Sequence, residues 1–463
     1  MNLRLSEILQ QFRHGEISRR DFVQAAALLG LGLGAAELLA SCVPTATTTP
    51  TSDVMLHFEG FDTVPTYALN HIHPEGTNTP PPEKEATTWY CSACGQRFAT
   101  LEAFQKHALA EHVWKLPEIL QVEEPTYRKG LVGVVKRFDE KNTIFSRLAW
   151  DEDLQKLEAA AAQAKEISGG GVDTIEGEAL VAGAIYVDKT AGNQHPYYPG
   201  YFGHMREVGG LYNWDDPVNS EQYSVSDPAV MSDRIKEVAR FYGADLVGIT
   251  TIDPLWVYEN YFEPITGKAD RLNIDNKYAI VMGIEMDWNT IDDTPGPNAS
   301  AATALAYSKM AEVSASLAKY IRSLGYPAIP CGNDTTQSIP LAIDAGLGEL
   351  GRLGLMLSPE FGPRQRLCKV LTDLPLVPDK PIDFGIQSYC ETCHACCQAC
   401  PADAIRWEDR TTEGTSISNR PGILRWPVDV EKCHLFWTEN GYDCSNCVAA
   451  CPWALQPRRM TEF

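Results

Sequence analysis

The middle of the chain alternates stretches of helical periodicity with stretches of strand-like apolar sequence. Helical periodicity is found in three stretches, residues 153–167, 231–242 and 300–324, and the last two end directly before Gly243 and Gly325. Apolar runs that predict strands lie at 132–138, 244–250 and 277–286. Helices interleaved with strands predict an α/β or α+β layered fold.

Nine of the fourteen cysteines fall between residues 390 and 451. The first run follows C-x2-C-x2-C-x3-C-P, a spacing in which three thiolates bind one [4Fe-4S] cluster and the fourth binds another. A second run repeats this spacing with its first gap widened to ten residues. The crossed arrangement assigns one cluster to Cys390, Cys393, Cys396 and Cys451, and the other to Cys400, Cys433, Cys444 and Cys447. Cys397 is left over, and a disulfide framework is the alternative interpretation.

A third metal-binding pattern lies nearer the N-terminus, in residues 89–114. Cys91-x2-Cys94-x12-His107-x4-His112 has the spacing of a Cys2His2 zinc finger, with a helix expected from about 101 to 112. Phe98 and Phe104 fall at the two positions that form the small core of such a finger. We therefore expect a small module that zinc folds; without metal, Cys91 and Cys94 could oxidise instead.

The first 88 residues resemble an export signal and a tether. Arg19-Arg20 precede twelve apolar residues, Ala25 to Ala36, which are too few to span a bilayer. This pattern predicts a twin-arginine signal over 1–41, and the alternative is a helical hairpin of the mature fold. Cys42 ends a lipobox-like sequence and is the expected lipid attachment site. The Pro/Thr-rich stretch 42–88 that follows is predicted to be a tether.

The composition limits the classes of molecule that the protein is expected to bind. The chain has 463 residues, with 39 basic and 61 acidic side chains and a formal net charge of −22. An acidic surface repels phosphate backbones, so nucleic acid is not expected as a partner. Fourteen cysteines in a chain of this size point to bound metal rather than to disulfide staples.

Four further sequence blocks carry a family resemblance. They are IPCGND at 329–334, AGLGELGR at 345–352, SPEFGPRQR at 358–366 and LTDLPL at 371–376. In this order, and followed by the two cysteine runs, they resemble the corrinoid-dependent reductive dehalogenases over about residues 115–457. The resemblance implies a nitroreductase-like corrinoid-binding domain at 115–385 and a ferredoxin-like domain with two [4Fe-4S] clusters at 386–457.

The resemblance also implies a mechanism and a set of site residues. In this family the clusters reduce a base-off corrinoid to Co(I), which cleaves a carbon–halogen bond, and a tyrosine protonates the carbon. The tyrosine is carried onto Tyr307, with Asn333 as an amide beside it. A phenol is a weak acid unless a cation stabilises its anion, and Arg366 or Arg364 could supply that charge. The glycines of the second block, Gly346, Gly348 and Gly351, would let the backbone approach the corrinoid, although a tight turn would use them as well.

Alternatives remain open at this point. Tyr307 could be a core aromatic, since Tyr258, Tyr261 and Tyr326 are also available. An epoxyqueuosine-reductase-like enzyme would need a cytosolic chain and an Asp where Tyr307 stands. A non-catalytic iron–sulfur electron-transfer lipoprotein would lack the corrinoid. The leading interpretation is an organohalide reductase at the outer face of the membrane. Its expected partners are an organohalide, a membrane-associated electron donor and a small membrane anchor protein.

Overall fold

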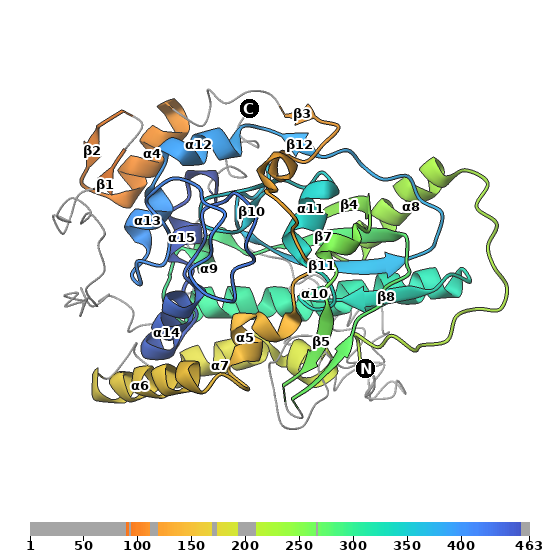
Figure 1. The fold of residues 1–463 in the computed structure, drawn as a ribbon, viewed down its shortest axis with the longest axis horizontal. Coiled ribbons are helices and arrows are strands. Elements are labelled where there is room, and N and C mark those ends of the chain that lie inside the picture. The colour runs from red at the N-terminus through yellow and green to blue at the C-terminus, as the bar shows by residue number, and fades with distance from the viewer. Residues whose placement is uncertain are drawn as a thin grey trace, which may run out of the picture. The chain divides into compact units, whose positions relative to one another are not determined.

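The computed structural model describes residues 89–91, 94–111, 119–168, 174–192, 210–264 and 267–454 (Figure 1). The predicted signal, the lipobox cysteine Cys42, the tether and the fourth zinc ligand His112 lie outside these ranges. Within the described ranges, no helix combines the length and the apolar character that crossing a bilayer requires.

A four-stranded antiparallel sheet organises the large domain (Figure 1). Its strand order is β4-β7-β11-β8. The strands are β4 (Leu246–Thr251), β7 (Tyr278–Glu285), β11 (Gln365–Thr372) and β8 (Ala328–Cys331). The first two confirm the predicted strands at 244–250 and 277–286.

Successive side chains of the sheet pack on opposite layers, as the strand period of two requires. On β7, Ile280, Met282 and Ile284 belong to the core that includes α8 (Pro228–Phe241) and α10 (Pro297–Ser323). The alternating Ala279 and Val281 belong to a second core with α11 (Ser338–Asp344). Burial on both faces explains why the strand reads as an unbroken apolar run.

The predicted helices are confirmed, and their ends have local causes. The stretch 153–167 lies in α6 (Glu152–Ser168). Helix α8 begins after Asp227, whose side chain accepts a hydrogen bond from the Ala229 backbone N–H. Helix α10 has Pro297 in its first turn. Gly243 and Gly325 follow α8 and α10 with φ of +110° and +85°, a conformation that favours glycine.

The predicted strand at 132–138 is wrong. Only Leu131, just before it, forms a bridge, with Ile423. Gly133 has φ +72°, which interrupts an extended strand, and Val134 is 91% exposed. The backbone of the run hydrogen-bonds to Gly422 at Val132 and to Glu259 at Phe138, but no continuous strand pairing forms between these ends within the described ranges.

Shorter elements complete the large domain. The short helices before α8 are η2 (Thr126–Gly130), η3 (Glu140–Asn142), α5 (Ile144–Arg147), α7 (Ile175–Ala184) and η4 (Asp188–Gly192). Those after it are η5 (Pro254–Trp256) and α9 (Trp288–Ile291). Three antiparallel pairs join β3 (Leu120–Gln121) to β12 (Ile382–Asp383), β5 (Asn260–Glu263) to β6 (Lys268–Arg271), and β9 (Glu349–Leu350) to β10 (Met356–Leu357).

The cysteine-rich segment packs directly on the large domain. It contains α12 (Ile386–Thr392), α13 (Ala395–Ala399), α14 (Val430–Asn440) and α15 (Asn446–Ala449). Its buried cysteines belong to the same core as α10 and the sheet. Arg352 ties the two parts together, because its guanidinium donates to the carbonyl oxygens of Cys390 and Arg406 at 2.9 and 2.8 Å.

The finger-like module is a small ββα unit. It consists of β1 (Trp89–Tyr90), β2 (Arg97–Phe98) and α4 (Leu101–Glu111). The two rings at the predicted core positions, Phe98 and Phe104, have centroids 6.0 Å apart. The local fold is thus the one that the zinc-finger spacing predicts.

Candidate active site and metal centres

Tyr307, Asn333 and Arg366 meet although they are far apart in the sequence. Tyr307 lies on α10, Asn333 follows β8, and Arg366 is the second residue of β11. The Asn333 amide and one Arg366 Nη1 each donate a hydrogen bond of 3.1 Å to the Tyr307 hydroxyl oxygen. The Arg366 guanidinium carbon stands 4.9 Å from the centroid of the Tyr307 ring. Three residues that the resemblance implied for one site are therefore in contact.

The surroundings of Tyr307 act on its acidity in both directions. Burial raises the pKa of the phenol, whereas the charge of Arg366 and the hydrogen bond from Asn333 lower it. The nearby Asp443 carboxylate raises the pKa of Tyr307 again. Because both hydrogen-bonded neighbours donate to the phenol oxygen, neither of them accepts the hydroxyl proton. The arrangement can hold a phenol that gives up its proton elsewhere and can stabilise the phenolate left behind.

Arg364 does not supply this charge. Its Nε donates to the Ala454 carbonyl at 2.7 Å and its Nη1 to the Glu285 carboxylate at 2.9 Å. The side chain is buried, and it joins the end of the cysteine-rich segment to β7. The choice left open by the sequence is therefore corrected to Arg366, because the guanidinium of Arg364 is already bound by acceptors away from Tyr307.

The other candidate tyrosines have different surroundings. Tyr261 donates to the Glu263 carboxylate at 3.2 Å, and Tyr326 donates to the Tyr223 carbonyl at 2.9 Å. Burial and the Glu263 charge raise the pKa of Tyr261, which weakens it as an acid. Burial likewise raises the pKa of Tyr258. The Tyr307 hydroxyl, in contrast, accepts a hydrogen bond from an arginine.

A buried lysine holds the loop that carries Asn333. The Lys369 ammonium on β11 donates to the carbonyl oxygens of Gly332 and Thr336, at 2.5 and 3.1 Å, and to the Ser338 hydroxyl at 2.9 Å. Lys369 is fully buried, and burial lowers its pKa. The acceptors lie on one loop, with Gly332 before Asn333 and Thr336 and Ser338 after it. Lys369 therefore holds the loop on both sides of Asn333.

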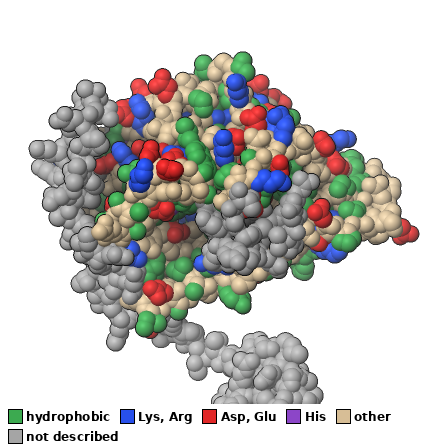
Figure 2. Space-filling view, turned by 60° about the horizontal axis from the view of Figure 1, so that its bottom comes forward, with side chains coloured by type: hydrophobic (Ala, Val, Ile, Leu, Met, Phe, Trp, Pro, Cys, Tyr) green, Lys and Arg blue, Asp and Glu red, His purple; other side chains and the backbone are tan. Residues whose placement is uncertain are grey.

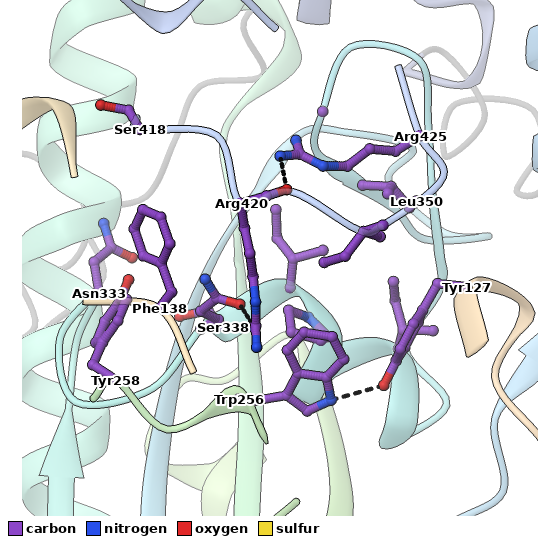
Figure 3. A pocket seen from close by; sticks show the side chains of 16 residues that line it. Tyr127, Phe138, Trp256, Tyr258, Asn333, Ser338, Leu350, Ser418, Arg420 and Arg425 are labelled. Atoms are coloured by element: carbon purple, nitrogen blue, oxygen red, sulfur yellow. Dashed lines mark hydrogen bonds between the residues drawn. The ribbon is translucent and has the colours of Figure 1, made fainter. Parts of the chain in front are cut away.

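A cavity of about 360 Å³ lies beside Asn333 (Figure 3). Tyr258 and Phe138 stand on the side of Asn333, Trp256 and Tyr127 form the opposite part, and Arg420 lies between them. The Arg420 guanidinium carbon is 4.9 Å from the Trp256 ring centroid, and its Nη1 donates to the Gln337 amide oxygen at 3.1 Å. Further polar and apolar lining comes from Ser338, Ile339, Pro340, Ile343, Leu350, Gly354, Ser418, Ile423 and Arg425.

The walls of this cavity fit a corrinoid in their chemistry. Among the residues that line it, Arg420 has a buried atom, Nε, without a hydrogen-bond partner within the described ranges, and Asn333 and Gln337 add amide groups. A corrinoid has a largely apolar ring rimmed with amides, which aromatic walls and such donors and acceptors can bind. None of the residues that line the cavity is a histidine. The lining therefore agrees with a corrinoid that takes no imidazole from this wall.

The three glycines expected at the cofactor are explained by the packing of the chain itself. A Cβ at Gly346 would lie 2.4 Å from the Lys380 carbonyl oxygen, and one at Gly348 would lie 2.0 Å from that of Leu357. A Cβ at Gly351 would meet the Leu357 side chain at 2.4 Å. None of the three lines the cavity. Close packing within the chain accounts for all three, and their cofactor role stays a prediction.

The cluster cysteines gather in the two sets that crossed ligation requires. Burial raises the pKa of the Cys451 thiol, and the neighbouring Cys390, Cys393 and Cys396 raise it further. No disulfide forms among the described cysteines. Buried thiols crowded in this way repel one another as thiolates unless metal neutralises them, so the set fits an iron–sulfur cluster.

Burial and neighbouring thiols also raise the pKa values of cysteines in the second set. Burial raises the pKa of Cys433 to about 12, with further contributions from Cys444 and Cys400. Burial also raises the pKa of Cys447, beside Cys444, Cys433, Cys396 and Cys400. Cys396 belongs to the first set but raises the pKa of Cys447 in the second, so the two sets adjoin. The leftover thiol of Cys397 instead donates to the Arg406 carbonyl at 3.4 Å.

The second cysteine set adjoins the helix that carries Tyr307. The Asp443 backbone N–H donates to the Ser300 hydroxyl of α10 at 2.9 Å, and the Ser445 N–H donates to the Thr294 hydroxyl at 2.7 Å. Burial raises the pKa of Asp443, and the charge of Arg366 lowers it. The residues around Cys444 therefore contact the helix that carries Tyr307 and the segment just before it.

Three of the four predicted zinc ligands lie together. The Sγ atoms of Cys91 and Cys94 and a ring nitrogen of His107 are all within 4.8 Å of one another. The Cys94 Sγ and His107 Nε2 atoms are 3.1 Å apart. Gly95, with φ +80°, donates its N–H to the Cys91 carbonyl at 2.7 Å and turns the chain so that both thiols point to one place. The donor set suits Zn²⁺.

Lys369, Asp443 and Arg420 were not singled out from the sequence. Asp443 directly precedes a cluster ligand, which is the only local signal that any of them carries. The contacts of Lys369 and Arg420 join segments that are distant along the chain, so no motif marks them.

The C-terminal segment matches the family model described as a 4Fe-4S dicluster domain, over residues 389–455. A tetrachloroethene reductive dehalogenase of Desulfitobacterium hafniense is 39% identical over 292 residues, which are 53% of each chain. One of Sulfurospirillum multivorans is 36% identical over 337 residues, or 66% of each chain. The chain thus spans about half the length of the first of these relatives and about two thirds of the second.

A solved reductive dehalogenase, reported as suggesting a mechanism for B12-dependent dehalogenation, has the same fold. It is 25% identical with a TM-score of 0.53, and the match covers 74% of this chain and 46% of that one. The match thus extends well beyond the dicluster segment. The sequence similarity thus includes the large domain as well as the cysteine-rich segment, and the fold is shared. Together these findings show that the chain belongs to the reductive dehalogenase family.

Proposed function

We propose that the chain catalyses the reductive removal of halogen from an organohalide. In this reaction R–X, two electrons and one proton give R–H and a halide ion. The observation that carries the proposal is the Tyr307 hydroxyl held between Asn333 and Arg366, beside an aromatic-walled cavity. A proton donor, a cation and an electron-supplying cysteine segment meet within one member of the reductive dehalogenase family.

The cavity would hold a corrinoid through its aromatic walls and its polar points. Trp256, Tyr258 and Phe138 would pack on the ring, while Gln337 and Arg420 would meet its amides. When bound and reduced, the corrinoid supplies a cobalt centre able to deliver electrons to a carbon–halogen bond, and the two [4Fe-4S] clusters supply those electrons one at a time. The contact between the second cysteine set and α10 supports an order in which electrons pass from the first set through the second.

The side chains of this site manage the proton and the halide. Tyr307 donates its hydroxyl proton to the carbon that loses the halogen. Arg366 stabilises the resulting phenolate from 3.1 Å and attracts the departing halide. Asn333 fixes the position of the phenol oxygen, and Lys369 fixes the loop of Asn333. The phenolate then regains a proton from solvent.

Zinc binding by the finger-like module forms part of the proposal. Cys91, Cys94 and His107 already converge, and His112 has the spacing of a fourth ligand. A module of this size lacks enough core to fold alone, so a bound metal would supply the missing stability.

We also propose that the protein works outside the cytoplasm at the membrane surface. The Arg19-Arg20 signal and the lipobox-like Cys42 support this location, with a membrane-associated donor and a small anchor protein as partners. Among the described residues in Figure 2, acidic and basic side chains are interspersed. Incorporation of labelled lipid in the host, lost in Cys42→Ser, would test the anchor.

The test of activity starts with anaerobic reconstitution of the chain with corrinoid. About one cobalt, eight irons and one zinc per chain are expected. Halide release from a panel of chlorinated and brominated compounds would then be measured with a low-potential reductant. Release that requires both cobalt and iron supports the proposal.

Other outcomes identify the alternatives. Iron without cobalt, and no halide release, would leave an electron-transfer protein. Conversion of an epoxide-bearing tRNA stem loop instead of an organohalide would indicate the epoxyqueuosine-reductase-like activity. The presence of Tyr307 where that activity would need an Asp, and the net charge of −22, disfavour this alternative.

A further inference from the structure

The finger-like module shares its small core with the first cluster-binding loop. Its core of Cys91, Phe104 and Ala108 also contains Ala395, and Cys393 packs against it. Phe104 and Ala395 are 2% and 1% exposed, so the contact between the two segments is dry. Figure 1 shows β1, β2 and α4 beside α12 and α13, which agrees with these contacts. A predicted metal ligand, Cys91, thus lies in the same cluster of side chains as a predicted cluster ligand, Cys393.

A buried hydrogen bond fixes the module on its other side. Gln105 of α4 donates from Nε2 to the Ala449 carbonyl at 2.6 Å. Gln105 is only 4% exposed. Ala449 ends α15, two residues before Cys451. The module therefore touches both segments that bind the first cluster, the loop of Cys393 and the end of the helix that leads to Cys451.

The module has few secondary-structure residues of its own. Each of its strands has two residues, and its helix has eleven. A metal ion bound by Cys91, Cys94 and His107 would join the hairpin to the helix more firmly than the ring contacts of Phe98 with Phe104 and His107 do alone. Loss of that ion would free α4, with Phe104 and Gln105, to leave the cysteine-rich segment.

We propose that metal binding by Cys91, Cys94 and His107 closes the module as a cap over the cluster held by Cys390, Cys393, Cys396 and Cys451. This inference rests on the zinc site and the clusters proposed above. The other cysteine set is the one that contacts α10, so the capped cluster is taken as the first to receive electrons, in the order proposed above. Solvent exposure is one of the factors that set the potential and the lability of such clusters, so zinc controls access at the point of electron entry.

The test uses the full chain with both clusters assembled under anaerobic conditions. Three variants are compared with the wild type: Cys94→Ser, which removes a zinc ligand; Gln105→Ala, which breaks the contact with Ala449; and Lys106→Ala, an exposed neighbour on α4, as the matched control. Zinc per chain is measured first. Iron release to a ferrous chelator in aerated buffer is then followed, together with the potentials of the two clusters.

In the wild type and in Lys106→Ala, both clusters should release iron slowly. Cys94→Ser should lose zinc and release half of its iron at least tenfold faster, while the other half keeps the wild-type rate. Gln105→Ala should keep zinc yet release the same half about tenfold faster, because a buried hydrogen bond no longer holds the module closed. The midpoint potential of one cluster alone should shift in Cys94→Ser.

The two ways to fail are distinct. Wild-type protein that contains no zinc would refute the zinc site and the cap with it. Zinc that binds as expected, with iron release and both potentials unchanged in Cys94→Ser and Gln105→Ala, would refute the cap and leave the zinc site standing.

Discussion

Replacement of Arg366 by methionine removes the charge beside the Tyr307 phenol while keeping a side chain of similar length. The Arg366 Nη1 atom lies 3.1 Å from the phenol oxygen, and the guanidinium carbon lies 4.9 Å from the ring centroid. Charges about 4 Å apart interact by about 4 kcal/mol at an effective dielectric constant of about 20. If the proton is about half transferred in the transition state, about 2 kcal/mol of this is lost, or about 30-fold in rate.

The pH dependence gives an independent reading of the same interaction. Tyr307 acts as an acid, so activity is present below its pKa and is lost as pH rises through it. Burial raises that pKa and Arg366 lowers it. Arg366→Met should therefore move the basic limb of the rate profile to higher pH, although the rate on the plateau falls. Arg366→Lys keeps the charge without the planar guanidinium and should recover most of the rate.

The assay is kcat for halide release under anaerobic conditions, at a series of pH values, with cobalt and iron contents measured for each variant. Contents equal to wild type would ensure that the comparison concerns the site alone. A methionine variant within about threefold of wild type with an unmoved basic limb would refute the role of the charge. Equal losses in the methionine and lysine variants would show that guanidinium geometry, rather than charge, is what matters.

Three further predictions concern the tyrosine, the buried lysine and the leftover thiol. Tyr307→Phe should lower kcat by about 10² to 10⁴ while cobalt and iron stay bound, and full activity would mean that another group is the acid. Lys369→Met should lower the free energy of unfolding by about 1–3 kcal/mol, because three acceptors lose their donor, whereas the exposed Lys319→Met should not; anaerobic denaturant titration measures both. Cys397→Ala should keep about eight irons per chain and Cys396→Ala should not, by iron analysis after reconstitution; iron loss in Cys397→Ala would contradict the ligand sets.

Local patterns in the sequence were sufficient for the parts of this protein whose cause is local. The helices at 153–167, 231–242 and 300–324 follow from apolar spacing and from the glycines that end two of them. The cysteine runs indicate iron–sulfur ligands because a thiolate set must have a fixed short spacing to wrap one cluster. The zinc spacing predicts the ββα module for the same reason.

Where the sequence failed, the answer depended on distant partners. Within the described residues, the backbone of the apolar run at 132–138 hydrogen-bonds to the backbone of other segments only at its ends, so it forms no strand, and nothing within the run itself shows this. Arg364 and Arg366 are equivalent as sequence, and only the sheet decides that one reaches Tyr307 while the other binds Ala454 and Glu285. The glycines of 345–352 meet Lys380 and Leu357 of the chain itself, a contact that tertiary packing creates.

The sequence by itself determined the residue types of this site, namely a phenol, an amide, a guanidinium and two sets of thiols. Tertiary structure decided which of them touch, because α10, the loop after β8 and strand β11 bring Tyr307, Asn333 and Arg366 together across a shared core. It also decided that the finger-like module lies on the loop of Cys393. Contacts of this kind depend on how faces pack, and face packing leaves no periodic signal along the chain.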